Sequence, residues 1–145
     1  MIEDALDMSR LENNKFSIFR EFFELRQAIE GVCAIMRFQL EQKGIQLKVD
    51  IDECVPHRIF TDQKRFKQVL FNLLGNASKF TFQGSISVKV NFEDEWLISD
   101  VLDTGIGISE EDLKKLFQFF GCIAKSKDIN RGGMGLGLTI SKMIL

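Results

Sequence analysis

The stretch FKQVLFNLLGNASKFT, at residues 66–81, decides the fold of this 145-residue chain. Its apolar residues recur every three or four positions, so a helix would place them on one face. These residues are Phe66, Val69, Leu70, Leu73, Leu74 and Ala77. Asp62 is a favourable N-cap, and the pattern therefore predicts a helix from Asp62 to about Phe80.

A polar flank of the same predicted helix carries Asn72, Asn76 and Lys79, at the spacing i, i+4 and i+7. A carboxamide oxygen is a good neutral ligand for a hard cation such as Mg²⁺, and a lysine ammonium group can hold phosphate. Taken alone, the flank fits a solvated helix face with ordinary asparagines better than a binding site. However, Asn is a mediocre helix former, so two of them one turn apart call for a reason.

Helices and strands are both predicted on either side of this helix. We expect helices at residues 1–14, 21–43, after Ser109 and from 136 to 145, and strands at residues 15–19, 45–51, 58–61, 86–90 and 97–102. Residues 121–135 are polar and glycine-rich, which predicts a loop. Because helices and strands do not simply alternate, we expect an α+β fold, a two-layer α/β sandwich in which helices cover one face of a mixed sheet.

The composition argues against several classes of protein. The formal net charge is -2, so the chain lacks the basic excess of a nucleic-acid binder. The three cysteines lie far apart, which argues against a disulfide framework or a zinc site and favours a reducing compartment. No apolar run is long enough to cross a bilayer. We therefore expect a cytoplasmic domain without direct membrane contact, and a membrane anchor elsewhere in a longer parent protein is compatible with this.

A second segment with possible chemistry is DTGIGI, at residues 103–108, which directly follows a predicted strand. Gly105 and Gly107 permit a tight turn and a close approach of the backbone to a ligand. The Asp103 carboxylate, at the strand end, can accept a hydrogen bond from an exocyclic amine. An ordinary strand-to-helix turn would have the same pattern. A Rossmann motif does not fit, because no third glycine follows at the required spacing.

A third segment, GGMGLGLT at residues 132–139, leads glycine-rich backbone into a predicted helix. Free N–H groups at the positive end of a helix form an anion site that suits phosphates. No Gly-Lys-Ser/Thr sequence closes the segment, so it is not a Walker A loop. A flexible linker is the alternative interpretation, but Leu136 and Leu138 pack like the start of a helix, and the glycines among them are costly unless a ligand needs close approach.

In this order, the segments resemble the motifs of the ATP-binding domain of sensor histidine kinases, in the Bergerat-fold ATPase superfamily. Residues 66–81 are similar to the N box of that family, residues 103–108 to its G1 box, LFQFF at residues 116–120 to its F box and residues 132–141 to its G2 box. The resemblance makes residues 15–145 an ATP-binding catalytic domain that lacks the final strands. Residues 1–14 resemble the end of the dimerisation and phosphoacceptor helix.

The resemblance implies a role for each motif in binding Mg²⁺ and ATP. Asn76 would coordinate Mg²⁺ with help from Asn72, Lys79 would contact phosphate, and Asp103 would bind the adenine amino group. The other implied contacts are Gly105, Gly107 and Ile108 around adenine, Phe117 and Phe120 as lid anchors, Gly133, Gly135 and Gly137 against the phosphates, and Leu136 and Leu138 on the apolar side. One of Lys125, Lys127 and Arg131 would meet the γ-phosphate, although solvated loop charges explain these residues equally well.

The implied activity is that of a protein histidine kinase, which transfers the γ-phosphoryl group of ATP to a histidine outside this chain. The single histidine, His57, lies beside Pro56 and not on a phosphoacceptor helix, so this fragment should bind ATP without autophosphorylating. Asn72 stands where related hydrolases have a glutamate. An amide cannot act as a general base near neutral pH, so ATP should be held without rapid hydrolysis.

The resemblance also implies partners. They are the histidine-bearing dimerisation domain of the same protein and the receiver domain of a response regulator, in a parent protein that forms a homodimer. The alternative function is a nucleotide-binding or interaction module without transfer activity.

Overall fold

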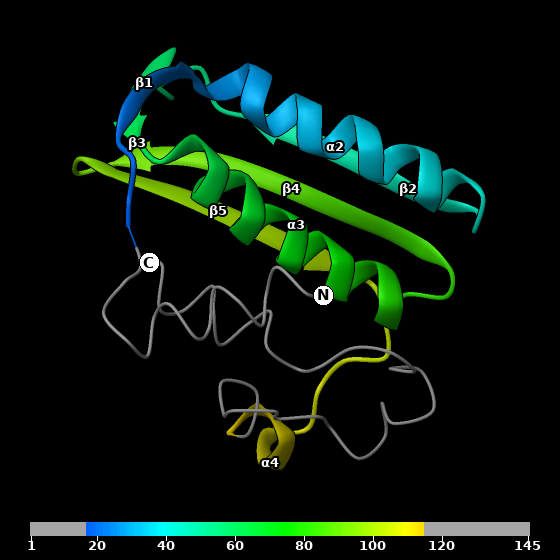
Figure 1. Ribbon diagram of the computed structural model, residues 1–145. Helices are drawn as coiled ribbons and strands as arrows, with labels where there is room; N and C mark the ends of the chain where they lie inside the picture. The colour runs from blue at the N-terminus through cyan, green and yellow to red at the C-terminus, as the bar shows by residue number, and fades with distance from the viewer. Residues whose placement is uncertain (1–16, 115–145) are drawn as a thin grey trace. The chain divides into compact units, whose positions relative to one another are not determined.

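The computed structural model describes residues 17–114 of the chain (Figure 1). Phe19–Gly107 form one structural unit, and the remaining described residues belong to a second unit. The predictions for residues 1–16 and 115–145, which include the F box, the G2 box and the loop at residues 121–135, lie outside the described residues.

The first unit is built on a three-stranded sheet in the order β2-β4-β5. The strands are β2 (Ile45–Ile51), β4 (Gly84–Glu93) and β5 (Trp96–Asp103). β2 runs parallel to β4, whereas β4 and β5 are antiparallel neighbours. The sheet is therefore mixed, as the sequence predicts.

Two helices, α2 (Leu25–Glu41) and α3 (Gln63–Phe80), cover one face of this sheet (Figure 1). The side chains that face them are buried, as Leu47, Ile86 and Val88 illustrate, while Lys48 and Lys89 on the other face are exposed. Strict alternation along the strands produces this contrast, because successive side chains point to opposite faces of a sheet. The predicted α+β sandwich, with helices on one face of a mixed sheet, is confirmed.

The beginning of the described chain differs from the prediction. A strand, β1 (Glu21–Glu24), pairs antiparallel with β3 (Arg58–Thr61). The strand expected at residues 15–19 is therefore wrong for its described part, residues 17–19, and the helix start expected at residue 21 is wrong as well. Phe22 fits the helical apolar pattern, but its ring lies 4.9 Å from that of Phe60 on the neighbouring strand. Cross-strand pairing of this kind overrides local helix periodicity, and the helix begins only at Leu25.

The two remaining connections agree with the sequence. β4 and β5 are joined by a tight hairpin at Asp94 and Glu95, which both have positive φ, and it lies between the two strands predicted at residues 86–90 and 97–102. In the second unit, Ser109 caps the short helix α4 (Glu110–Leu113) by accepting a hydrogen bond from the Asp112 amide, as predicted. Among residues 17–114, no helix is long and apolar enough to cross a membrane.

Candidate functional site

Helix α3 carries the first group of candidate residues. Its N-terminus is capped as predicted, because Asp62 Oδ1 accepts a hydrogen bond from the Arg65 amide at 3.0 Å. Leu70 and Leu74 are buried against the sheet side. The predicted helix is therefore confirmed. It carries Asn72, Asn76 and Lys79 on a flank distinct from the one formed by its buried leucines.

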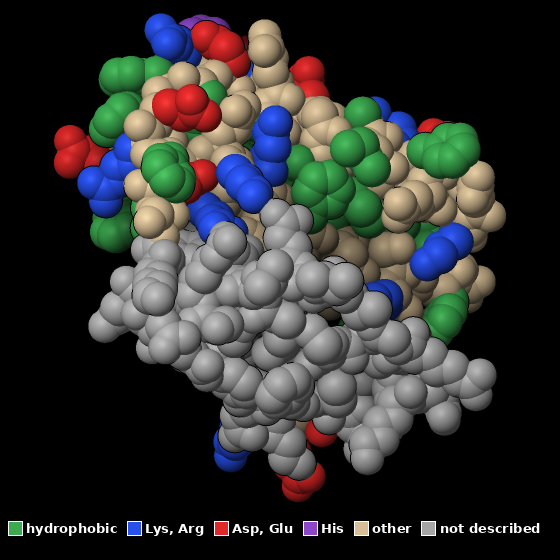
Figure 2. Space-filling view, viewed as in Figure 1, with side chains coloured by type: hydrophobic (Ala, Val, Ile, Leu, Met, Phe, Trp, Pro, Cys, Tyr) green, Lys and Arg blue, Asp and Glu red, His purple; other side chains and the backbone are tan. Residues whose placement is uncertain are grey.

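The three polar residues of this flank differ in exposure. Asn72 and Asn76 are half-buried, and Lys79 is exposed in the last turn of the helix. Two carboxamides one turn apart, followed by an ammonium group, offer neutral oxygen ligands beside a positive charge. On the face drawn in Figure 2, basic and acidic side chains are interspersed. A site for a polyanion therefore depends on individual groups such as those of this flank of α3.

Asp103 is the last residue of β5 and lies opposite Ile86 in the β4–β5 register. This register places it on the sheet face that the helices cover, at the end of the strand, where its side chain is exposed. Asp103 Oδ1 accepts a hydrogen bond from the Gly105 amide at 2.8 Å. The carboxylate is thus oriented by its own turn and keeps acceptor capacity for another donor.

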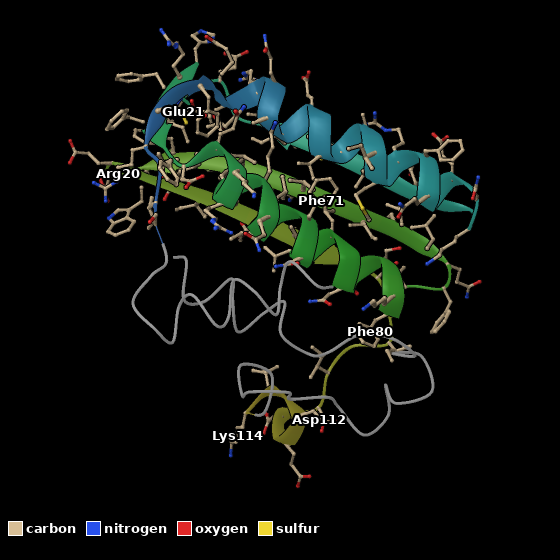
Figure 3. All side chains as sticks on the ribbon, in the orientation of Figure 1. Arg20, Glu21, Phe71, Phe80, Asp112 and Lys114 are labelled. Atoms are coloured by element: carbon tan, nitrogen blue, oxygen red, sulfur yellow. The ribbon has the colours of Figure 1, made fainter. Side chains whose placement is uncertain are left out.

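The turn after Asp103 is attached to the end of α3. The Ile106 amide donates a hydrogen bond to the Phe80 carbonyl at 3.1 Å, and Figure 3 shows Phe80 at that end of the helix. A Cβ atom added at Gly105 would collide with the Phe80 carbonyl oxygen and lie 2.8 Å from Asp103 Oδ1. Only glycine therefore permits this close approach.

A pair of hydrogen bonds also fixes the same turn to the sheet. The Thr104 amide donates to the Ser85 carbonyl at 3.2 Å, and the Ser85 amide donates to Thr104 Oγ1 at 3.1 Å. Gly107 has a φ of 70°, a backbone conformation that favours glycine. The structure thus joins two of the predicted motifs, the turn that begins at Asp103 and the helix that carries Asn76 and Lys79.

Other candidate residues are not joined to these two motifs by any described contact. Ile108 is exposed and belongs to the second unit. The remaining candidates lie outside the described residues, so their roles stay predictions: Phe117, Phe120, Lys125, Lys127, Arg131, Gly133, Gly135, Leu136, Gly137 and Leu138. His57 is exposed at a bend before β3, where its carbonyl accepts a hydrogen bond from the Leu25 amide at 2.9 Å.

Two residues at the junction of α3 and the turn were not predicted to take part in the site. Phe80 contributes its carbonyl group, a role that no side-chain pattern indicates. Thr81 is only 1% exposed, and its buried hydroxyl has no hydrogen-bond partner in the described part of the chain. Its burial could have been anticipated, because position 81 continues the spacing of Leu70, Leu74 and Ala77 by one more turn.

Comparison with known proteins assigns this arrangement to a family. Residues 61–145, more than half of the chain, match the family model described as "Histidine kinase-, DNA gyrase B-, and HSP90-like ATPase". The chain belongs to this ATPase family. Within it, the chain corresponds to the catalytic, ATP-binding domain of two-component sensor histidine kinases, which confirms the predicted class of domain.

Two curated relatives illustrate the match in sequence. The autoinducer 2 sensor kinase/phosphatase LuxQ of Vibrio cholerae is 40% identical over 144 residues, which are 97% of this chain and 17% of the relative. The signal transduction histidine-protein kinase BarA of Escherichia coli is 35% identical over 155 residues, covering 100% of this chain and 16% of BarA. The chain thus spans a small part of the length of the relatives it matches.

Solved structures show the same similarity in three dimensions. Full-length ShkA in complex with AMPPNP superposes with a TM-score of 0.84 at 26% identity, covering 99% of this chain and 29% of ShkA. The nucleotide-free catalytic domain of the histidine kinase ThkA superposes with a TM-score of 0.73 at 28% identity, covering 87% of this chain and 79% of that domain.

Proposed function

We propose that this chain binds ATP with Mg²⁺ and donates the γ-phosphoryl group to a histidine outside the chain. The observation that carries the proposal is the hydrogen bond between the Ile106 amide and the Phe80 carbonyl, at 3.1 Å. It fixes the turn of Asp103 to the end of the helix that bears Asn76 and Lys79. One ligand that offers a hydrogen-bond donor at one end and a polyanion at the other, such as ATP, matches groups placed in this way.

Adenine recognition is assigned to the turn that begins at Asp103. Its carboxylate accepts a hydrogen bond from the exocyclic amino group, and the Gly105 amide keeps the carboxylate in place from the other side. Gly105 and Gly107 let the backbone approach the ring plane, since neither carries a side chain. Guanine presents an oxygen where adenine has the amino group, so this contact selects adenine.

The polar flank of α3 suits the triphosphate and a magnesium ion. The ion prefers oxygen ligands and binds through one or two protein groups together with substrate phosphates. Half-buried Asn76 and Asn72 offer such oxygens, and no group of three or more His, Cys, Asp or Glu side chains in residues 17–114 offers a competing metal site. When bound, the ion neutralises phosphate charge, and Lys79 adds a positive charge one turn further along the helix.

The chain's own contribution to transfer is then positioning and charge stabilisation. The acceptor imidazole nitrogen attacks the γ-phosphorus, the bond to the bridging oxygen breaks, and ADP leaves with the negative charge that Lys79 helps to stabilise. Asn72 cannot accept a proton from water near neutral pH, so no group at that position activates water for hydrolysis. The site would therefore hold ATP until a histidine arrives.

The partners follow from this activity. We assign as phosphoryl acceptor a histidine-bearing dimerisation domain of the same protein, in a homodimeric parent, with a response-regulator receiver domain as the next acceptor. The similarity to LuxQ and BarA supports this assignment, since both are named as signalling kinases. A supply of ATP and access to such a receiver place the domain in the cytoplasm.

Calorimetry with ADP and Mg²⁺ on this chain tests the proposal directly. Asn76→Ala and Asp103→Ala should each weaken binding by about tenfold or more, because each removes a hydrogen bond or ligand to a charged or buried group. Asn91→Ala, in β4 on the uncovered sheet face, is the matched control and should bind as the unsubstituted chain does. Equal affinities in all four proteins would contradict the proposed site.

A second measurement separates a kinase from a binding module. The chain is mixed with a histidine-bearing dimerisation domain and ATP labelled at the γ-phosphate. Acid-labile label on the histidine domain is the expected result. Binding of ADP without any transfer would favour the nucleotide-binding or interaction module, and steady release of inorganic phosphate by the chain alone would favour a hydrolase.

A further inference from the structure

The last turn of α3 is bonded by three different parts of the chain. The final four carbonyl groups of a helix have no partners within it, and in α3 three of these carbonyls are bonded by different parts of the chain. The Thr81 amide bonds to the Ala77 carbonyl at 3.0 Å, and the Ile106 amide bonds to the Phe80 carbonyl at 3.1 Å. The third carbonyl, of Ser78, accepts from a side chain, the ammonium group of Lys43, at 3.1 Å.

Lys43 reaches this turn from the connection between α2 and β2. Its Nζ also lies 3.2 Å from Ser78 Oγ, so one ammonium group bonds to both polar groups of a single residue. Ser78 is only 6% exposed, and water therefore has little access to it. A cation at the C-terminus of a helix is also stabilised by the helix dipole.

The backbone of Lys43 is itself held in place. Its amide donates to the Leu40 carbonyl at 3.0 Å, and the next residue, Gly44, has a φ of 71° and donates to the Glu41 carbonyl at 3.0 Å. This turn ends α2 and starts β2. Lys43 is exposed as a residue, but its backbone is held by this turn and its ammonium group links the turn to Ser78 in α3.

We propose that Lys43 is a positioning residue for the nucleotide site, which it serves by holding the last turn of α3. This inference rests on the proposed function. Lys79 directly follows Ser78, and the Phe80 carbonyl that anchors Ile106 belongs to the same turn. Holding the Ser78 carbonyl thus fixes both the phosphate-binding ammonium group and the support of the Asp103 turn, although Lys43 does not touch the ligand.

Loss of the ammonium group has a defined consequence. The Ser78 carbonyl would stay buried without a partner, a state that costs free energy, and the last turn would relieve it by opening toward water. Opening would move Lys79 and release the Ile106 amide from Phe80. A lysine with only a structural role would lower stability but leave the site unchanged in the folded molecules.

The test compares Lys43→Met with Lys43→Arg, which keeps the charge and the donors. Lys48→Met is the matched control, because Lys48 is an exposed lysine in β2 on the sheet face that the helices do not cover. Calorimetry measures the Kd of Mg-ADP, and NMR measures the hydrogen exchange of the Ile106 amide, both on the 145-residue chain.

Lys43→Met should raise the Kd of Mg-ADP by about fivefold to tenfold. We expect this size because only part of the free energy of the charged hydrogen bond between Lys43 and Ser78 is passed on to nucleotide binding. The exchange of the Ile106 amide should become about tenfold faster, while amides in the middle of α2 change little. Lys43→Arg and Lys48→Met should stay within about twofold of the unsubstituted chain in both measurements.

A folded Lys43→Met protein with unchanged Kd and unchanged Ile106 exchange would overturn the inference, and so would a loss of stability without either change. If Lys43→Met does not fold, Lys43→Gln, which keeps a neutral donor, takes its place with the same two criteria. If the unsubstituted chain binds no ADP, the proposed function fails, and the exchange of Ile106 still decides whether Lys43 holds the turn.

Discussion

Gly105 packs directly against the backbone carbonyl of Phe80, close enough that no side-chain atom fits between them. This contact, together with the hydrogen bond from Ile106 to the same carbonyl, makes the end of α3 and the turn after β5 one structural element. The position of Asp103 relative to the helix therefore depends on the absence of a single Cβ atom.

Gly105→Ala should destabilise the fold by about 1–3 kcal/mol, because the added Cβ forces the turn away from the helix end. It should also weaken binding of Mg-ADP, since Asp103 moves with the turn. Urea unfolding and calorimetry measure the two effects. Gly31→Ala is the control: Gly31 lies in α2 with nothing within 4 Å of an added Cβ, and the change should stabilise the helix by about 0.5–1 kcal/mol.

The two buried hydroxyl groups at the end of α3 predict opposite responses to their removal. Thr81 Oγ1 has no partner within the described residues, so Thr81→Val should raise the free energy of unfolding by about 1 kcal/mol. Ser78 Oγ bonds to Lys43, so Ser78→Ala should lower it by about 0.5–1.5 kcal/mol. Urea unfolding of both variants checks the contrast, and a loss of stability in Thr81→Val would show that its hydroxyl has a partner in solution.

The hairpin between β4 and β5 holds two acidic residues in the left-handed region, with φ of 49° for Asp94 and 67° for Glu95. Residues with a side chain rarely adopt this backbone conformation, whereas glycine adopts it without strain. Glu95→Gly should therefore raise the melting temperature, through a gain of about 0.5–1 kcal/mol. Glu95→Pro should lower it, because proline cannot reach a positive φ. Differential scanning calorimetry distinguishes these outcomes.

A fourth prediction concerns the reactivity of the exposed Cys54. Its hydrogen bond with the Asp52 carboxylate raises the pKa of the thiol. Asp52→Asn removes the negative charge, so the pKa should fall and the thiolate fraction at pH 8 should increase. Faster alkylation of Cys54 by iodoacetamide, followed site by site with mass spectrometry, is the expected result.

The control for this measurement is Asp50→Asn, since Asp50 lies on the exposed face of β2. An unchanged alkylation rate in Asp52→Asn would contradict the prediction. Burial raises the pKa of the Cys33 thiol, so that site should stay unmodified in every folded variant and report any unfolding.

Strong local patterns made most of this fold predictable from sequence. The helical spacing of Leu70, Leu74 and Ala77 predicted α3, and strict alternation predicted β2 within the observed bounds. The failures lie where tertiary contacts outweigh local preference. Phe22 pairs with Phe60 across two strands, and such a partner is invisible in a window of neighbouring residues.

The candidate site was predictable to a similar extent. Motif spacing singled out Asn76 and Asp103 because side-chain chemistry identifies them. Phe80 acts through its carbonyl and Lys43 through a bond to a residue far along the chain. A role played by a backbone carbonyl, or by a side chain that bonds to a residue far along the chain, leaves no signal in composition or periodicity. Such roles are visible only in the three-dimensional structure.

The parallel pairing of β2 with β4 has a consequence for how the molecule folds. The segment that joins these two strands contains β3 and all of α3. A parallel pair forms only after its long connection has closed, and such distant pairings form slowly. Nucleotide affinity should therefore appear late in refolding, after the chain has gained most of its secondary structure.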